Sequence, residues 1–248
     1  YHCNYHRCQK RRGMMESTEA HAEETRTWEP KIAEQIIKLL QERRKVSQNG
    51  APLLVGLVGI PGCGKSTSSG ILSSILTANE IRNIIMPMDG YHYSLAQLQK
   101  FNNPVEAIYR RGAPDTFDSG GLENDLRKIR YGKEGVVHIP GFDHAKGDPE
   151  PKKFLFERHK HSVVICEGLY LLHRSDGWER IAELFDHVIF IDADVDNCVE
   201  RLKVRNLCIP GYTKEEILIR CDKVDRTNAM IVLKTKNKAG ICVQSTVM

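Results

Sequence analysis

The sequence predicts an α/β fold in which helices cover both faces of a mostly parallel sheet. Three observations support this prediction. Strand-sized apolar runs alternate with helical patterns, a glycine-rich loop follows the first run directly, and acidic residues end two of the other runs. Parallel strands are buried on both faces and therefore read as continuous apolar runs. Ligands of such sheets bind beyond the carboxyl ends of the strands, so the residues after each run are the candidates for function.

Five strands are predicted from runs rich in Val, Ile and Leu, namely PLLVGLV (52–58), IRNIIMPM (81–88), VVIC (163–166), HVIFID (187–192) and ICVQS (241–245). Helical spacing of apolar residues predicts helices at 30–44, 66–79, 178–185, 195–205 and 214–232. Strands and helices that alternate in this way indicate βαβ units within one domain.

Length and composition limit the class of protein. The chain has 248 residues, of which 41% are hydrophobic and 27% charged, which suits one domain with a buried core. A net charge of +4 fits anionic small-molecule ligands and is too small to indicate nucleic acid. No apolar run approaches the ~18–20 residues of a membrane span. We therefore expect neither a nucleic-acid partner nor a membrane partner.

The N-terminal segment 1–28 is polar and is expected to be disordered or of non-native origin, which places the domain at 29–248. Within the segment stands HCNYHRC (2–8), whose spacing matches no common zinc site. Residues 1–13 precede the first methionine and are expected to be an upstream remnant; the alternative is a basic transit-peptide stub, which would make the protein organellar. Cysteines in apolar runs and turns predict reduced thiols and a cytoplasmic location.

A phosphate-binding loop is predicted at GIPGCGKST, which fills the G-x-x-x-x-G-K-[ST] pattern. In this pattern backbone N–H groups surround phosphate oxygens, Lys65 reaches the β- and γ-phosphates, and Ser66 gives its hydroxyl to magnesium. The strand before it and the helical pattern after it are the context that this mechanism needs; a simple glycine turn is the alternative. Nucleoside triphosphate binding is therefore predicted for Gly59, Ile60, Pro61, Gly62, Cys63, Gly64, Lys65, Ser66 and Thr67. Cys63, beside Lys65 at a helix N-terminus, is expected to be an alkylatable thiolate.

GTPase function is disfavoured. The stretch NKAG (237–240) lacks the aspartate of the guanine-reading N-K-x-D motif, and DSGG (118–121) follows no predicted strand. The length of the chain is that of a small-molecule kinase.

Two acidic residues stand at predicted strand ends. Glu167 follows the third strand, where such folds hold magnesium, with a solvated loop residue as the alternative. Asp89 ends the second strand, where a carboxylate can accept the proton of an attacking hydroxyl; a cap or turn role is the alternative. Tyr91, His92 and Tyr93 come next and are expected to contact a hydroxylated substrate.

The motifs together resemble the uridine kinase, phosphoribulokinase and bacterial pantothenate kinase superfamily, and within it a poorly characterised branch. The resemblance spans roughly residues 52–243 and rests on GIPGCGKST, MDGYHY, RRGAPDTFD (110–118), GFDHAKGDP (141–149) and CEGLYLL. It implies a P-loop NTPase three-layer fold with strand order 2-3-1-4-5, a small helical lid at about 201–213, and ATP with Mg²⁺ as cofactors.

The resemblance also implies roles for single residues. It makes Asp89 the catalytic base and Glu167 the magnesium-side acid. It places Arg110 and Arg111 on the substrate side, where they would hold an anionic group, with a basic helix end as the alternative.

The segment ERLKVRN corresponds to the lid and carries Arg201 and Arg205, four residues apart on one helical face. At least one of these two arginines is expected to be catalytic, with ordinary surface arginines as the alternative. His144, with Asp143, is expected at the acceptor site or in a surface hairpin, and Asn228 occupies a family position without a derived role.

The predicted function is ATP-dependent transfer of a phosphoryl group to a hydroxyl of a small molecule, a nucleoside, pantothenate-like compound, glycerate or sugar. The segment YHYSLAQL (91–98) departs from both uridine and pantothenate kinases, so the acceptor stays open, as do GTP use and a homodimer. The alternative is a catalytically silent nucleotide-binding protein with a regulatory or interaction role.

Overall fold

The computed structural model describes residues 27–46, 51–143, 146–207 and 211–246. Its main sheet has five parallel strands in the hydrogen-bonded order β2-β5-β1-β6-β7. Numbered along the chain within this sheet, the order is 2-3-1-4-5, as the resemblance implies. The strands are β1 Leu53–Gly59, β2 Asn83–Pro87, β5 Val163–Gly168, β6 His187–Asp192 and β7 Ile241–Gln244. All five match strands predicted from the sequence.

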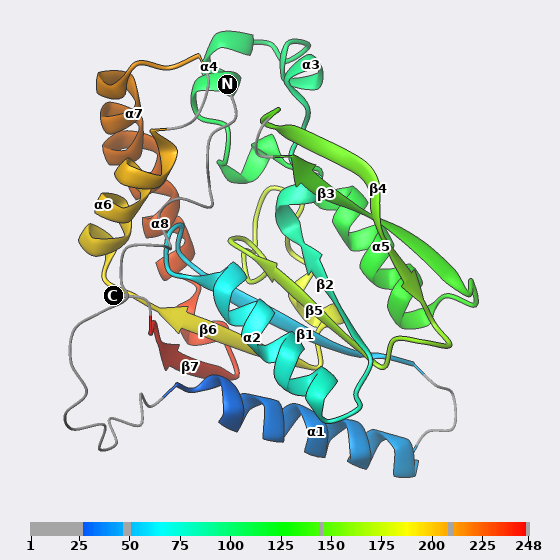
Figure 1. The fold of residues 1–248 in the computed structure, drawn as a ribbon. Coiled ribbons are helices and arrows are strands. Elements are labelled where there is room, and N and C mark those ends of the chain that lie inside the picture. Colours follow the sequence, from blue (N-terminus) through cyan, green and yellow to red (C-terminus); the bar gives the residue numbers. More distant parts are fainter. Residues whose placement is uncertain (1–26, 47–50, 144–145, 208–210, 247–248) are drawn as a thin grey trace, which may run out of the picture.

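Every residue of β1 and β5 is buried, which shows that helices and loops cover both faces of this sheet. Helix α2 (Lys65–Ala78) lies across the sheet, and α1 (Glu29–Val46) runs alongside α2 (Figure 1). Helix α5 (Ser119–Tyr131) and helix α8 (Arg226–Leu233) contribute side chains to the same core. The fold is therefore the three-layer arrangement that the apolar runs predict.

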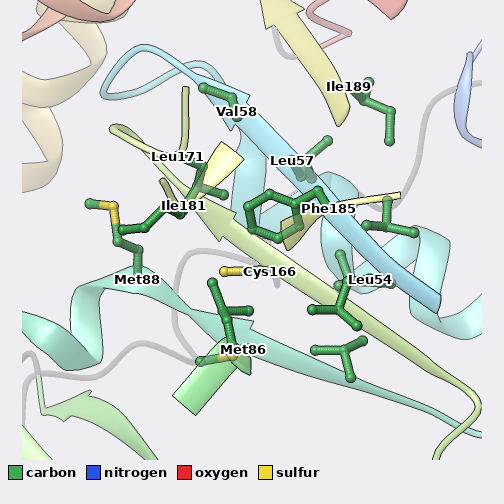
Figure 2. Packing of buried hydrophobic residues seen from close by; sticks show 14 of the residues in the cluster. Leu54, Leu57, Val58, Met86, Met88, Cys166, Leu171, Ile181, Phe185 and Ile189 are labelled. Atoms are coloured by element: carbon green, nitrogen blue, oxygen red, sulfur yellow. The ribbon is translucent and has the colours of Figure 1, made fainter. Parts of the chain in front are cut away.

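The core is densely packed around the central strands. The Phe185 ring lies against Gly56 of β1, where a Cβ atom would come within 3.3 Å of the ring (Figure 2). Met88 packs on Gly168, where a Cβ atom would meet the Met88 Cβ at 2.6 Å. The Met88–Gly168 contact brings the ends of β2 and β5 together, and the Phe185–Gly56 contact packs the segment before β6 on β1.

The helices after β6 differ in part from the prediction. Helix α6 (Val195–Asn206) is present, but the single helix expected at 214–232 consists of α7 (Lys214–Arg220), a π-helical segment (Cys221–Asp225) and α8. A π segment accommodates an extra residue within a helix and often marks a functional site. The predicted lid at 201–213 includes residues 208–210, which lie outside the described residues.

A second, two-stranded sheet was not among the predicted strands. It is the antiparallel pair β3 (Val136–Asp143) and β4 (Asp148–Glu157). Most of β4 is polar and solvent-accessible, so it lacks the apolar run on which the strand predictions rest. The hairpin considered for Asp143 is thus present. Helix α5 was also missed, because its first turn contains Gly120 and Gly121, which disfavour a helix. Short helices α3 (Leu95–Leu98) and α4 (Pro104–Tyr109) precede it.

The helix predicted at 178–185 is wrong. Only a 3-10 turn forms there, at Ala182–Leu184. Trp178, Ile181 and Leu184 are buried at intervals of three residues, which successive tight turns satisfy without a regular helix.

At the N-terminal side, Trp28 packs against the core and Glu29 is buried, so the folded part includes at least one residue assigned to the N-terminal segment. Residues 1–26, with HCNYHRC (2–8), lie outside the described residues. Over the described part of the chain, no helix is long and apolar enough to cross a membrane.

We predict that Trp178→Phe lowers the free energy of unfolding by about 1–3 kcal/mol, because it leaves a buried carbonyl without its donor. Trp178 is fully buried and its Nε1 donates to the Pro114 carbonyl at 3.2 Å. Chemical denaturation measures the change. Trp28→Phe is the matched control, since the Trp28 Nε1 has no hydrogen-bond partner in the described structure and its removal should cost less. Equal losses in the two variants would contradict the prediction.

Candidate active site

The phosphate-binding loop lies between β1 and α2 and is shaped by glycines. Gly62 and Gly64 have φ of 80° and 95°, a region that side chains rarely adopt. At Gly59, a Cβ atom would lie 2.6 Å from the Cys63 Sγ and 2.9 Å from the Ile191 carbonyl. The backbone therefore turns tightly enough for its N–H groups to surround a phosphate.

Helix α2 begins with unpaired donors. Gly64 is its N-cap and provides no side-chain cap, so the first N–H groups of the helix remain available to an anion. The Lys65 ammonium group donates to the carbonyls of Gly59 and Ile60, both at 3.0 Å, and is thereby held over the loop. This arrangement suits a polyphosphate, with one fixed cation beside the helix N-terminus.

Ser66 and Glu167 meet beside the loop. The Ser66 hydroxyl donates to the Glu167 carboxylate at 3.0 Å, although the two residues lie on different elements. Burial raises the pKa of Glu167, the Asp89 charge adds to this effect, and Lys65 and Ser66 oppose it. A nearly buried carboxylate with a raised pKa gains from a cation, and this is the environment in which a magnesium ion would bind.

Mg²⁺ would fit this pair. The ion keeps several waters and needs only one or two protein oxygens when it also binds phosphates. The described residues include no cluster of three His, Cys, Asp or Glu side chains that could hold a metal alone. Ser66 and Glu167 supply the hydroxyl and carboxylate oxygens that such a shared site requires.

Asp89 lies in a 3-10 helix (Met88–Tyr91) directly after β2. Pro87 pairs with Glu167 across the sheet, which brings Asp89 to the same sheet edge as Glu167 and the loop. The cap role considered for Asp89 is not observed, since the cap position is Pro87. The turn role is observed, because the Asp89 carbonyl accepts a hydrogen bond from the His92 N–H at 3.2 Å. Within the described structure the Asp89 carboxylate makes no hydrogen bond, so it can accept a proton.

His92 lies beside Asp89, and its Nδ1 is 2.9 Å from the Asp89 carbonyl oxygen. Its ring packs against Phe117 and Phe142, at centroid distances of 3.9 and 5.0 Å. Burial lowers the pKa of His92, whereas the Asp89 charge raises it. The nearby Arg111 charge also lowers the His92 pKa, so the ring is expected to be neutral near pH 7.

The two tyrosines of the segment differ in position. The Tyr91 side chain is buried and its hydroxyl donates to Asp125 at 3.0 Å, so the structure does not bring it to the loop. Burial raises the pKa of Tyr91, which keeps the phenol neutral. Tyr93 is half-buried, with its ring edge-on to Phe101. Of the two, only Tyr93 remains open to a substrate.

The predicted substrate arginines are both paired. Arg110 forms a bidentate ion pair with Asp115 on the surface. Arg111 donates to the Tyr93 carbonyl and to Asp148, each at 2.8 Å, and its side chain is only 12% exposed. Burial lowers the pKa of Arg111, and the Arg111 Nε is buried without a partner in the described structure. Arg111 therefore connects the substrate-side segment to β4 and leaves little of its guanidinium group for a ligand.

The two lid arginines lie on the same helix, α6, but have different hydrogen-bond partners. Arg201 donates to the Gly62 carbonyl at 3.0 Å and so contacts the phosphate loop. Arg205 is exposed and donates to the adjacent Asn206. Burial raises the pKa of Asp225, and the Arg205 charge partly opposes this shift. The structure thus brings Arg201, but not Arg205, to the loop.

Four further predicted positions have different outcomes. His144 lies outside the described residues, while Asp143 forms an ion pair with Lys146. Asn228 is buried, with its Nδ2 close to Gly112. Cys63 is only 1% exposed, so the alkylation expected from its sequence position would require the loop to open.

Sequence reasoning missed Arg220. Its guanidinium group donates to the Arg111 carbonyl at 2.6 Å and its charge lowers the pKa of His92. It therefore adds a positive charge on the acceptor side. No motif marks it, because it reaches the site from α7 through the tertiary fold.

A cavity of about 470 Å³ adjoins the loop at the ends of β6 and β7. It is lined by Asp192, Asn197, Arg201 and Gln244, among others, and Ser245 donates to the Cys63 carbonyl at 2.9 Å. Polar groups that adjoin a phosphate loop in this way offer space for the nucleoside of a bound nucleotide. Asp192 ends the strand predicted at 187–192 but was given no role there, and no motif marks Gln244.

The fold and the loop define the chain as a P-loop kinase. Residues 54–247 match the Phosphoribulokinase / Uridine kinase family, and the chain belongs to that family. The resemblance noted in the sequence is thereby confirmed.

Similar proteins agree with this assignment. The chain is 34% identical to the "Putative uridine kinase C227.14" of Schizosaccharomyces pombe over 213 residues, 84% of this chain and 86% of that protein. It is 31% identical to the "ATP-dependent kinase YFH7" of Zygosaccharomyces rouxii, over 63% of this chain and about half (49%) of that protein. A solved structure from Silicibacter sp. TM1040, a "putative fructose transport system kinase", is 27% identical with a TM-score of 0.71 and covers 84% of this chain and 98% of its own.

We predict that Glu167→Gln stabilises the fold while it weakens binding of Mg-ATP. Because burial raises the pKa of Glu167, the folded state binds the proton more tightly than the unfolded state. The Glu167 carboxyl therefore lowers the free energy of unfolding of the parent protein as pH rises from the ordinary carboxyl range through the raised pKa. The Glu167→Gln variant should lack this decrease.

Denaturation at several pH values and titration with Mg-ATP would measure the two effects. Glu150→Gln, at an exposed carboxylate of β4, is the control and should change neither. A variant that keeps the parent's pH dependence would contradict the prediction.

Proposed function

We propose that the protein transfers the γ-phosphate of ATP to a hydroxyl group of a small molecule. One observation carries the proposal. Lys65, the Ser66–Glu167 pair and Asp89 meet at the carboxyl ends of β1, β5 and β2, although they are far apart in the sequence. A nucleotide-binding protein needs the loop, but it does not need a free carboxylate beside it.

Each group has a role in phosphoryl transfer. Lys65 and the loop N–H groups offset the charge on the phosphates, and Arg201 supports the loop from α6. Ser66 and Glu167 would hold Mg²⁺, which neutralises charge that develops on the phosphate oxygens. Asp89 accepts the proton of the attacking hydroxyl.

The acceptor would lie between Asp89 and the β3–β4 hairpin. His92 and Tyr93 border this space, and the charges of Arg111 and Arg220 lower the pKa of His92. A neutral imidazole can donate or accept a hydrogen bond, which suits a polyhydroxylated acceptor. The names of the similar proteins, which refer to uridine and fructose, are compatible with such an acceptor. A homodimer and a cytoplasmic location stay predictions.

We predict that Lys65→Ala abolishes ATP-dependent turnover and the thermal shift that Mg-ATP causes. The variant removes the cation that the carbonyls of Gly59 and Ile60 hold over the loop, beside the helix N-terminus. ADP formation would be measured against a panel of nucleosides, pantothenate, glycerate and sugars. Unchanged Mg-ATP binding in the variant would overturn nucleotide binding by this loop. A parent that binds ATP tightly but is stimulated by no acceptor would favour the silent nucleotide-binding alternative.

We predict that Asp89→Asn lowers kcat by ~10²–10⁴-fold, the usual contribution of a general base. The Kd for ATP and the melting temperature should hardly change, because the carboxylate makes no hydrogen bond within the described structure. Steady-state kinetics and thermal denaturation would measure this. Asp176→Asn, at an exposed aspartate, is the matched control. A loss below about tenfold would make Asp89 a group that only orients the acceptor, since the transition state of phosphoryl transfer is loose.

A further inference from the structure

A second cavity, of about 680 Å³, lies at the end of the sheet opposite the phosphate loop. Its lining includes four cations, Arg43, Arg130, Lys133 and Arg158, and the Tyr131 ring. The end of α1, the start of β1 and the end of α5 come together on this side of the molecule (Figure 1). Since β1 has seven residues, the cavity lies about 20 Å from the phosphate loop. It is therefore separate from the site described above.

Hydrogen bonds and ion pairs within the protein neutralise only part of this positive charge. Asp186 accepts hydrogen bonds from Arg43, from Arg130 at 2.9 Å and from the Leu54 N–H at 2.8 Å. Arg158 donates to two carbonyls in the last turn of α5, at 2.8 and 2.9 Å. The C-termini of α1 and α5 each contribute roughly half a negative charge. Together with Asp186 they balance about two of the four cations, and the Glu134 carboxylate, which lies against Gly132 of the lining, balances about one more, so about one positive charge remains.

Several donors on the residues that line the cavity have no protein partner in the described structure. Within the described part of the chain, Arg130 Nη2, Arg158 Nη1 and Lys133 Nζ make no hydrogen bond. None of them is among the buried unpaired atoms, so they are accessible to solvent. Arg130 Nε donates to the Tyr131 hydroxyl at 3.0 Å, and its guanidinium carbon lies 5.4 Å from the centre of that ring. The Tyr131 residue is 63% exposed. An accessible ring thus stands beside accessible cationic donors.

We propose that this cavity is a second ligand site, which binds a small anion carrying phosphate groups. Guanidinium groups match the geometry of phosphate oxygens and can bind them bidentately. The remaining positive charge and the donors without a protein partner favour an anion such as a phosphate monoester or a pyrophosphate. Because Arg43 and Arg130 are already held by Asp186, and Arg158 by α5, the donors are positioned before the ligand arrives, which lowers the entropic cost of binding.

Calorimetric titration with inorganic pyrophosphate would test the proposal. The full chain with Lys65→Ala is used in EDTA and 0.1 M salt, so that the phosphate loop contributes little. Adding Lys133→Glu, a charge reversal at an exposed residue without a partner in the described structure, should weaken binding by about tenfold or more. Adding Lys133→Ala should give a smaller loss.

The control is Lys31→Glu, the same charge change at an exposed residue in the first turn of α1. It lies about 18 Å along that helix from Arg43, beyond the Debye length at this salt, and should leave the affinity within about twofold. Equal losses in the Lys133→Glu and Lys31→Glu variants would show a non-specific charge effect and overturn the proposal. No pyrophosphate binding by the Lys65→Ala chain, or binding unaffected by Lys133→Glu, would also overturn it.

Discussion

The candidate active site depends on the position of β5 between β1 and β2. Glu167 pairs with Leu57 of β1 on one side and with Pro87 of β2 on the other. The phosphate loop follows the first of these strands and Asp89 the second. Hydrogen bonds of a parallel sheet hold the three strand ends level, so Glu167 comes within hydrogen-bond distance of Ser66, and Asp89 lies at the same edge without a direct bond to either. A slip of one residue in this register would turn Glu167 toward the opposite face.

The acceptor side is held by aromatic packing and side-chain hydrogen bonds, and not by strand pairing. Phe117 packs edge-on against both Tyr170 and Trp178, and the Tyr170 hydroxyl donates to the Gly112 carbonyl at 2.7 Å. These contacts dock the segment between α4 and α5 onto the segment after β5. Arg111 extends the connection to β4. The scaffold therefore uses several residues of the substrate-side motif for structure, and leaves Asp89 and the ring of His92 closest to the proposed acceptor.

The buried acid illustrates how function opposes stability in this protein. Burial raises the pKa of Glu167, so its ionised form lowers the stability of the fold at neutral pH. An alanine or glutamine would pack there at less cost, yet neither could hold a cation. The cost is small beside the apolar burial of β1 and β5, in which every residue is buried. The central strands can therefore support a polar group at their ends.

The sequence by itself determined the five strands of the main sheet, the phosphate loop and the two strand-end acids, because continuous apolar runs and a glycine pattern are local signals. It missed α5 and the β3–β4 pair, whose residues are polar or rich in glycine and gain their structure from packing against the core. The tertiary structure alone decided which neighbours each side chain meets. It turned Tyr91 toward Asp125, and it paired Arg110 with Asp115 and Arg111 with Asp148. It also brought Arg201 to the phosphate loop and Arg220 to the acceptor side. Such contacts join residues from different elements, and their partners depend on side-chain direction and burial, which the order of residues along the chain does not encode locally.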